Sequence, residues 1–445
     1  MQQNIMRTKK VLPLLLQMSL PVMLSMLIQS LYNIVDSLWV AKLGTDALTA
    51  VSLAFPLQNI VLSLGVGMGV GMGSLMSIHL GSGDREQASV TASTGMALIL
   101  VHCLVFFLGG LLVTRPFLSL CTDDETVLEL ACDYTLIVLC LSWGMLVQMG
   151  LEKIFQGCGR MTATMAMVLT GCGLNIVLDP ILIFGLLGFP AMGIRGAAIA
   201  TVIGQTVPVF LYLLLYFRKD LGLTLSPRFV RLDGKRIREI YLVGIPSTLV
   251  LAMPSLLTGI LNGILAGLGS LYVAVFGLYY KLQTFVILPA SGVIQGMRPI
   301  ISYNYGAGEK DRVRQIIRWS LTIVGCILAL GTVLALGFPR QILGLFEADA
   351  DLLEAGIPAL RIIGLGLVIS TLATVACGVF EALGRGKTSL VLSLLRQLVI
   401  LVPVGWVLSR FLGATGIWLA FPLAEIAALI PAALWLRKLI KTELR

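Results

Sequence analysis

Residues 19–44 read SLPVMLSMLIQSLYNIVDSLWVAKLG, an apolar run interrupted by a few polar side chains. They lie in an apolar segment from about residue 11 to residue 40, which is long enough to cross a bilayer as a helix. At 100° per residue the polar side chains fall on one narrow stripe, and the other faces carry Leu, Ile, Val and Met. The stripe therefore predicts a helix face that water and a substrate can reach. Its members are Ser25, Gln29, Tyr32, Asn33 and Asp36.

Asp36 and Pro21 are the two unusual residues of this predicted helix. A carboxylate near the membrane core costs roughly 2.5–3.5 kcal/mol on insertion scales, so Asp36 is expected to face a cavity or a partner and to have a function. The alternative is a structural Asp36 near the outer helix end, solvated by lipid headgroups. Pro21 removes one backbone hydrogen bond and frees the carbonyl of Gln17, so the helix can bend there.

The composition indicates a polytopic membrane protein. The chain has 445 residues, of which 57% are hydrophobic and 12% charged, and its mean hydropathy is +0.95. The eight Cys residues lie mostly in apolar segments without a CxxC motif, and there are only two His. We therefore expect no disulfide framework and no cofactor. Since no Ser/His/Asp or Cys/His set is available, the chain is not expected to be an enzyme.

Twelve apolar segments of membrane-spanning length predict an all-α protein with twelve transmembrane helices. Of the 32 Lys and Arg residues, 23 fall on the side of the N-terminus, five on the other side and four at membrane depth. By the positive-inside rule both termini are cytoplasmic. The segments lie at about 11–40, 48–79, 88–113, 124–150, 162–187, 195–217, 240–268, 271–303, 316–337, 352–380, 388–412 and 415–436.

The two halves of the sequence are copies of each other. At a constant offset of 225, Pro21 matches Pro246, Gly44 matches Gly269, and the inner loop GSGD (81–84) matches GAGE (306–309). Six spans per copy give both copies the same orientation, so a pseudo-two-fold along the membrane normal is expected to relate two six-helix lobes. We expect an N-terminal lobe (1–217), a basic cytoplasmic linker (218–239) and a C-terminal lobe (240–445).

Two glycine-containing motifs resemble nucleotide loops. GVGMGVGMGS (65–74) has no preceding strand and no following Lys, and its glycines are spaced for helix packing of the small-xxx-small type. GRGKTS (384–389) resembles the end of a P-loop, but the residue three positions before Gly384 is Glu381 instead of the required Gly. We therefore expect no nucleotide site and no nucleic-acid partner.

A second polar group lies in the fifth predicted span, within NIVLDP (175–180). Asn175 and Asp179 are four residues apart on one helical face, and Pro180 frees a nearby backbone carbonyl as a second hinge. Thr201 lies two turns into the sixth span from the outside. The topology places these groups and Asp36 at the same depth in the first lobe. The alternative for Asp179 is a structural residue at the helix end.

Two carboxylates in a partly dry site oppose each other's ionisation, so the site can hold and release a proton. Na⁺ could use the same oxygens, with Asp36, Asp179 and Asn175 as its ligands, and the sequence does not choose between the two ions. At the same offset, Asp36 corresponds to Leu261 and Asp179 to Val404. Coupling is therefore expected in the N-terminal lobe alone.

The second lobe carries other intramembrane charges. Glu381 and Arg298 lie near inner helix ends, where they could form an ion pair. Glu425 is nearest to mid-depth, where it could contact a cationic substrate or be paired with Lys281 or Arg396.

These motifs together resemble the multidrug and toxic compound extrusion (MATE) transporters over the whole chain, most of all the DNA-damage-inducible-protein-F-like branch. The resemblance implies that Pro21 is the bending proline, that Gln29 lines the substrate path, and that Asp36 and Asp179 are the coupling acids. It also assigns the amide to Asn175 and the hydroxyl to Thr201. The motifs are YNIVDSLWVAKLG (32–44), GSGDREQA (81–88), NIVLDPILIFG (175–185), GIRGAAIAT (193–201) and YNYGAG (303–308).

The function expected from the resemblance is secondary active export of cationic, amphipathic drugs in exchange for H⁺ or Na⁺. The expected location is the bacterial cytoplasmic membrane, where the protein would work as a monomer among lipids. One alternative is a flippase for lipid-linked sugars of the same superfamily, which would need several Arg facing the lobe interface. Another is a membrane scaffold or channel.

Overall fold

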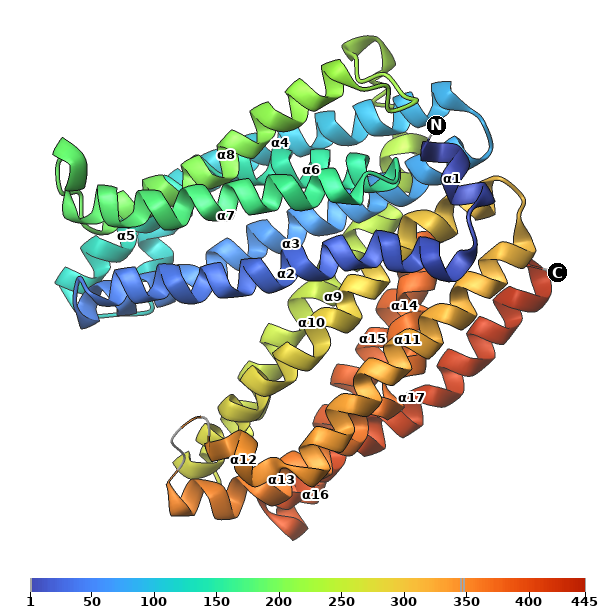
Figure 1. Cartoon of the computed structure of the whole chain (residues 1–445). Coiled ribbons are helices and arrows are strands. Elements are labelled where there is room, and N and C mark those ends of the chain that lie inside the picture. Colours follow the sequence, from blue (N-terminus) through green and yellow to red (C-terminus); the bar gives the residue numbers. More distant parts are fainter. Residues whose placement is uncertain (1, 345, 347–348, 445) are drawn as a thin grey trace. The chain divides into compact units, whose positions relative to one another are not determined.

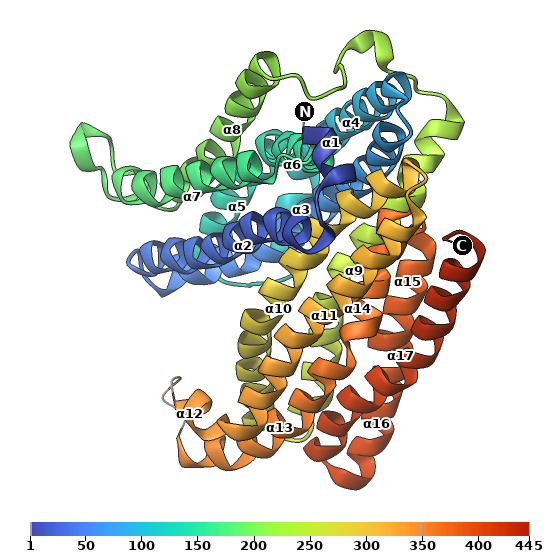
Figure 2. The same ribbon diagram turned by 45° about the vertical axis from the view of Figure 1, so that its right-hand side comes forward.

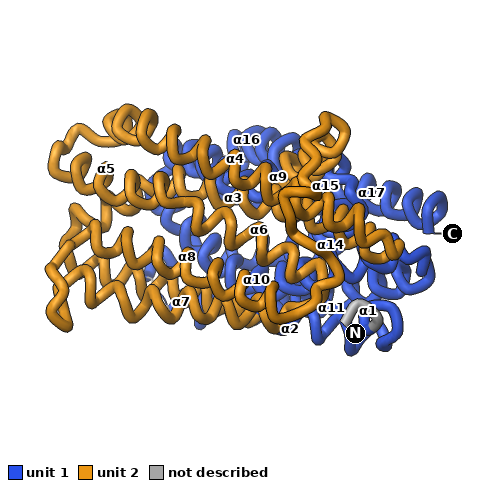
Figure 3. The backbone as a smooth tube through the Cα atoms, turned by 90° about the horizontal axis from the view of Figure 1, so that it is seen from above, with its two compact units in different colours: residues 1, 3–23, 249–445 blue, residues 2, 24–248 orange. Residues whose placement is uncertain are grey.

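The structure is a computed structural model that describes residues 2–344, 346 and 349–444, with the side chains of 2–4 excepted. The chain divides into two compact units, coloured separately in Figure 3. Unit 2 holds residues 24–248 and Gln2, and unit 1 holds residues 3–23 and the described residues of 249–444. The boundary lies inside two helices, two residues beyond Pro21 and two residues beyond Pro246.

The described residues form helices and loops without a β-strand (Figure 1). Within the described part of the chain, eleven helices are long and apolar enough to span a membrane, and there are twelve spans when a helix pair bent by 42° is counted as one. This confirms the predicted all-α architecture. The helices are α1 (Gln2–Thr8), α2 (Val11–Ala41), α3 (Thr45–Gly81), α4 (Arg85–Leu118), the bent pair α5 (Glu125–Cys140) and α6 (Trp143–Gly157), α7 (Met161–Phe184), η1 (Leu186–Gly188), α8 (Ile194–Arg218), η2 (Pro227–Phe229), α9 (Gly234–Ala266), α10 (Ser270–Gly306), α11 (Lys310–Gly337), α12 (Pro339–Gly344), α13 (Ala350–Ile369), α14 (Thr371–Ala382), α15 (Gly386–Leu394), the π-helix η3 (Leu395–Ile400), α16 (Leu401–Leu412) and α17 (Ala414–Thr442).

The internal repeat is visible in the helix boundaries. Both ends of α3 and α10 are related by the sequence offset of 225, and so are the last residues of α2 and α9. Gly44 and Gly269, which precede α3 and α10, both have a positive φ, of 117° and 141°. Such backbone conformations favour glycine, so the same turn recurs in both copies.

The offset changes where the first copy carries an insertion. Gly193 and Gly413 precede α8 and α17 with nearly the same φ, 55° and 60°, but they are related by an offset of 220. The extra residues in 186–193 form a loop that folds back on the end of α7. Its closing hydrogen bonds run from the N–H of Met192 to the carbonyl of Leu182 (2.9 Å) and from the N–H of Gly193 to the carbonyl of Ile183 (3.1 Å).

The glycines of α3 serve helix packing, as the sequence predicts. A Cβ at Gly69 would lie 2.6 Å from the Lys153 side chain on α6. A Cβ at Gly71 would lie 2.5 Å from the backbone carbonyl oxygen of Ile240, in the part of α9 that belongs to unit 2. Two faces of α3 therefore approach neighbouring backbones closely because they lack side chains.

We expect Gly71→Ala to destabilise the protein by about 1–3 kcal/mol, because the new methyl group meets backbone atoms that cannot rotate away. Gly109→Ala is the matched control, since a Cβ at Gly109 meets nothing within 4 Å and alanine is the better helix former. Thermal unfolding of both variants in detergent checks this. Equal melting temperatures for the two variants would contradict the packing role of Gly71.

Candidate functional site

The polar side chains predicted to share one depth do meet inside unit 2. α2 carries Asp36, α7 carries Asn175 and Asp179, and α8 carries Thr201. α7 packs along α8 (Figure 1), and α2 contacts α7 through the edge-to-face pair of Trp39 and Phe184, whose ring centroids are 6.2 Å apart.

The two carboxyl groups are neighbours in the same cluster. The side chains of Asp36 and Asp179 lie within hydrogen-bonding reach of each other. Asp179 is completely buried, whereas Asp36 is half-buried. One oxygen of each carboxyl group, Oδ1, is buried and has no hydrogen-bond partner among the described residues. Such atoms are rare in proteins, so the site has unused capacity for a proton or a cation.

Asn175 connects Asp179 to α8. In the amide orientation that satisfies both of its polar atoms, Nδ2 donates to Oδ2 of Asp179 at 2.8 Å and Oδ1 accepts from the backbone N–H of Thr201 at 3.1 Å. The hydroxyl of Thr201 lies 3.3 Å from the same amide. In this orientation the amide offers the acid its donor group and turns its oxygen away from the acid.

Close helix contact explains why α7 and α8 can place these groups together. A Cβ at Gly171 would lie 2.5 Å from the carbonyl oxygen of Gly204, and a Cβ at Gly204 would lie 3.2 Å from Cβ of Asn175. The two glycines therefore let the backbones approach one turn away from the amide. At the start of α8, Arg195 donates to both carboxylate oxygens of Asp133 on α5, each at 2.9 Å.

Two residues of the cluster were missed by the sequence analysis. Tyr134 of α5 is buried, and its hydroxyl accepts a hydrogen bond from Nε2 of Gln58 on α3 at 3.3 Å. The hydroxyl of Tyr134 and that of the predicted Tyr32 both lie within hydrogen-bonding reach of Thr201. Both lie beside other polar residues of the predicted spans, Tyr134 within DYT (133–135) and Gln58 within QN (58–59). The depth argument that selected Thr201 also selects these two residues.

The other predicted site residues of α2 differ in their exposure. Gln29 and Asn33 are exposed, Ser25 is buried on α2, and Asn33 uses its backbone carbonyl to accept from the Ser37 hydroxyl at 2.8 Å. α2 continues through Pro21 and α7 continues through Pro180. These two prolines are thus positioned as possible hinges within helices that carry the acids.

In unit 1, four of the intramembrane charges form two ion pairs. Glu425 lies 3.6 Å from Nε of Arg396, which is one of the two partners weighed in the sequence analysis. Nη1 of Arg396 also donates to the Thr374 hydroxyl at 3.1 Å. The expected ion pair between Arg298 and Glu381 is present.

The positions of unit 1 that correspond to the acid cluster are apolar. Leu261, the equivalent of Asp36, is completely buried in a hydrophobic cluster that includes Ala359, the equivalent of Tyr134. Ile400, the equivalent of Asn175, packs against this cluster, as does Phe421, which corresponds to Thr201 when the insertion is taken into account. The second copy of the repeat thus fills with hydrocarbon the place where the first copy holds polar groups.

We expect Tyr134→Phe to lower transport about three- to tenfold without unfolding the protein, because it removes one hydroxyl that bonds to Gln58 and Thr201. Transport assays of the variant check this. Tyr216→Phe is the matched control, since the hydroxyl of Tyr216 accepts a hydrogen bond from the backbone N–H of Leu225 outside the cluster. Unchanged transport by the first variant would remove Tyr134 from the site.

Comparison with known proteins gives consistent results. The family model described as MatE matches residues 21–181 and again residues 246–407. The multidrug export protein MepA of Staphylococcus saprophyticus is 26% identical over 421 residues, which cover 94% of this chain and 92% of that protein. A crystal structure of MATE in the bent conformation has a TM-score of 0.91 and 27% identity, covering 99% of this chain and 97% of its own. One in the straight conformation has a TM-score of 0.89 and 27% identity, covering 96% of both chains.

The double match falls on the two copies found in the sequence, and the starts of the two matched regions, positions 21 and 246, are related by the same offset as the copies. Because these regions make up well over half of the residues, the chain belongs to the MatE family of membrane transporters.

Proposed function

We propose that the chain is a secondary active antiporter that exports cationic, amphipathic drugs in exchange for protons. The similarity to MepA, a multidrug export protein, supports this substrate class. The charge asymmetry of the loops supports a bacterial cytoplasmic membrane with both termini inside.

The observation that carries the proposal is the contact between the carboxyl groups of Asp36 and Asp179. A hydrogen bond between two acids needs one proton, because two carboxylates have only acceptor atoms. The amide of Asn175 donates to Asp179, so this set resembles a proton site more than a cage of oxygen ligands for Na⁺.

In the proposed cycle, Asp36 is the acid that exchanges its proton with water, since it is the less buried of the two. A proton taken up from outside neutralises the pair, α2 bends at Pro21, and the drug leaves. The two repeats then rock, and the proton is released on the inside. The membrane potential supplies roughly 2.3 kcal/mol per charge per 100 mV for the inward proton, which offsets the same cost of moving a singly charged drug outward. The pH gradient therefore drives a one-for-one exchange.

Paired cations speak against the flippase alternative. A pyrophosphate site needs arginines that are free to bind it, but Arg298 is paired with Glu381, and Arg396 lies beside Glu425. Arg361 donates its Nε to the backbone carbonyl of Leu336 at 3.3 Å.

Drug uptake into proteoliposomes under an imposed pH gradient or Na⁺ gradient, applied separately, tests the proposal. We expect ethidium movement with the pH gradient and none with the Na⁺ gradient. Ethidium movement with the Na⁺ gradient alone would identify Na⁺, and not H⁺, as the coupling ion. No drug movement with either ion, together with transfer of a lipid-linked sugar between leaflets, would replace the antiporter with a flippase.

A further inference from the structure

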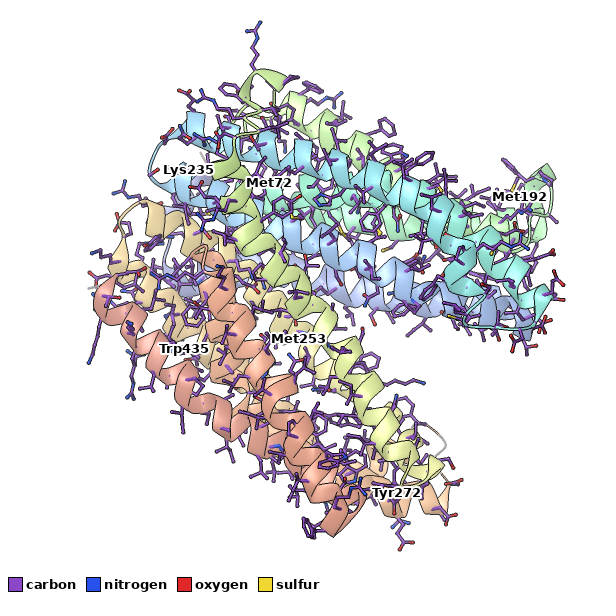
Figure 4. All side chains as sticks on the ribbon, turned by 180° about the vertical axis from the view of Figure 1, so that it is seen from behind. Met72, Met192, Lys235, Met253, Tyr272 and Trp435 are labelled. Atoms are coloured by element: carbon purple, nitrogen blue, oxygen red, sulfur yellow. The ribbon has the colours of Figure 1, made fainter. Side chains whose placement is uncertain are left out.

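A basic cavity lies at the end of unit 1 that is expected to face the cytoplasm. It has a volume of about 530 Å³ and lies between the start of α15 and the end of α17. These two helices run side by side in Figure 2, and Figure 4 labels Trp435 on α17. The lining side chains that matter here are Arg385, Lys387, Thr388, Trp435, Lys438 and Thr442.

The charges of this cavity are only partly compensated. Arg385 forms an ion pair with Glu443, whose Oε2 also accepts a hydrogen bond from the Tyr305 hydroxyl at 3.3 Å. Lys387 and Lys438 are exposed, and neither forms an ion pair within the part of the chain that the structure describes. Since Glu443 offsets Arg385, the ammonium groups of Lys387 and Lys438 leave the cavity lining with a net positive charge, which favours an anion.

The surroundings of the cavity fit a ligand that is both anionic and apolar. Trp435 is half-buried in the wall, and tryptophan is enriched where a membrane meets water. Val391, also in the wall, is 47% exposed on a helix that spans the membrane, so an acyl chain could lie along it. Basic pockets at the cytoplasmic ends of membrane helices bind phosphate headgroups of lipids.

A free nucleotide fits this place less well, although the cavity includes part of the GRGKTS stretch (384–389). Glu381 occupies the position that a phosphate loop reserves for its first glycine. It is buried, is paired with Arg298, and accepts a hydrogen bond from Ser389 at 3.1 Å. The carboxylate of Glu381 therefore holds the loop in place, and its negative charge disfavours a phosphate group beside it.

We propose that this cavity binds the phosphate headgroup of an anionic lipid from the cytoplasmic leaflet, held by Lys387 and Lys438 with the acyl chains beside Val391. The site is separate from the acid cluster, which lies in unit 2, and its occupancy does not depend on the identity of the coupling ion.

Native mass spectrometry of the full-length protein in detergent tests the proposal with phosphatidylglycerol as the probe and phosphatidylcholine as its neutral match. We expect one phosphatidylglycerol to be retained at least about tenfold more tightly than phosphatidylcholine. The double variant Lys387→Gln with Lys438→Gln should lose about ten- to thirtyfold in affinity for phosphatidylglycerol. Inorganic phosphate and ATP, added separately, should not displace the lipid.

The matched control is Arg437→Gln with Lys441→Gln, which removes two exposed charges from the same end of α17 outside the cavity. It should change the affinity less than about threefold. An equal loss of phosphatidylglycerol affinity in both double variants would overturn the proposal, because it would show that the lipid responds to general surface charge and not to this cavity. Tighter binding of phosphate or ATP than of the lipid would overturn it in favour of a free anion.

The wild-type protein offers a second measurement, which does not depend on how the variants fold. Phosphatidylglycerol, but not phosphatidylcholine, should slow chemical acetylation of Lys387 and Lys438 and leave Lys441 unprotected. Equal protection of all three lysines, or none, would contradict the assigned site.

Discussion

Asp36→Asn is expected to abolish proton-driven drug export while leaving the protein folded and in the membrane. The amide has nearly the same shape as the acid, and it keeps a hydrogen-bonding side chain beside Asp179. It cannot bind and release a proton, so drug movement is no longer linked to the pH gradient. Loss of a hydrogen bond to a charged group is worth at least about tenfold, and loss of the exchangeable proton should bring export to the background rate.

Ethidium efflux from cells and pH-driven uptake into proteoliposomes both measure this effect. Asp46→Asn is the matched control, since it makes the same chemical change at an exposed acid near the start of α3, outside the cluster. A variant of Asp36 that exports ethidium at the wild-type rate would refute the coupling role.

The sequence predicted the architecture well because its signals are strong. Span length follows from apolar runs, and an offset of 225 in the sequence reappears in the bounds of α3 and α10. The proximity of Asp36 and Asp179 followed from the topology, because polar residues at equal depth in one six-helix lobe are expected to lie close together. The break between α5 and α6 at Leu141 and Ser142 was not predicted. The apolar segment 124–150 contains no proline and no polar run at that point that would indicate a break.

The contacts of single side chains were harder to predict. Tyr134 and Gln58 were not predicted, because only the packing of α5 against α3 and α8 shows that these two polar side chains meet beside Thr201. Arg396, the partner of Glu425, lies in the π-helix η3, where the period of the side chains differs from that of an α-helix. A helical wheel with a uniform period cannot show such a difference.

The second large effect is expected from making the first copy of the repeat resemble the second. The triple variant Asp36→Leu, Asn175→Ile and Asp179→Val introduces the residues found at the corresponding positions 261, 400 and 404. It should lose all ion-coupled transport. It should also be more stable than the wild type by about 1–4 kcal/mol, because well-packed apolar residues replace a buried polar group that is only partly satisfied.

The double variant Asp36→Leu and Asp179→Val separates the two parts of this argument. It leaves the buried amide of Asn175 without the carboxylate to which Nδ2 donates, and an unpaired buried donor costs about 1–3 kcal/mol. The double variant should therefore be less stable than the triple variant, and both should be inactive. Thermal unfolding in detergent and proteoliposome uptake measure the two properties on the same samples. A triple variant that melts below the wild type would show that the acids hold α2 and α7 together, which is the structural role of Asp179 weighed against its coupling role. A stable and inactive triple variant means instead that the acid cluster is retained at a cost in stability because transport requires it.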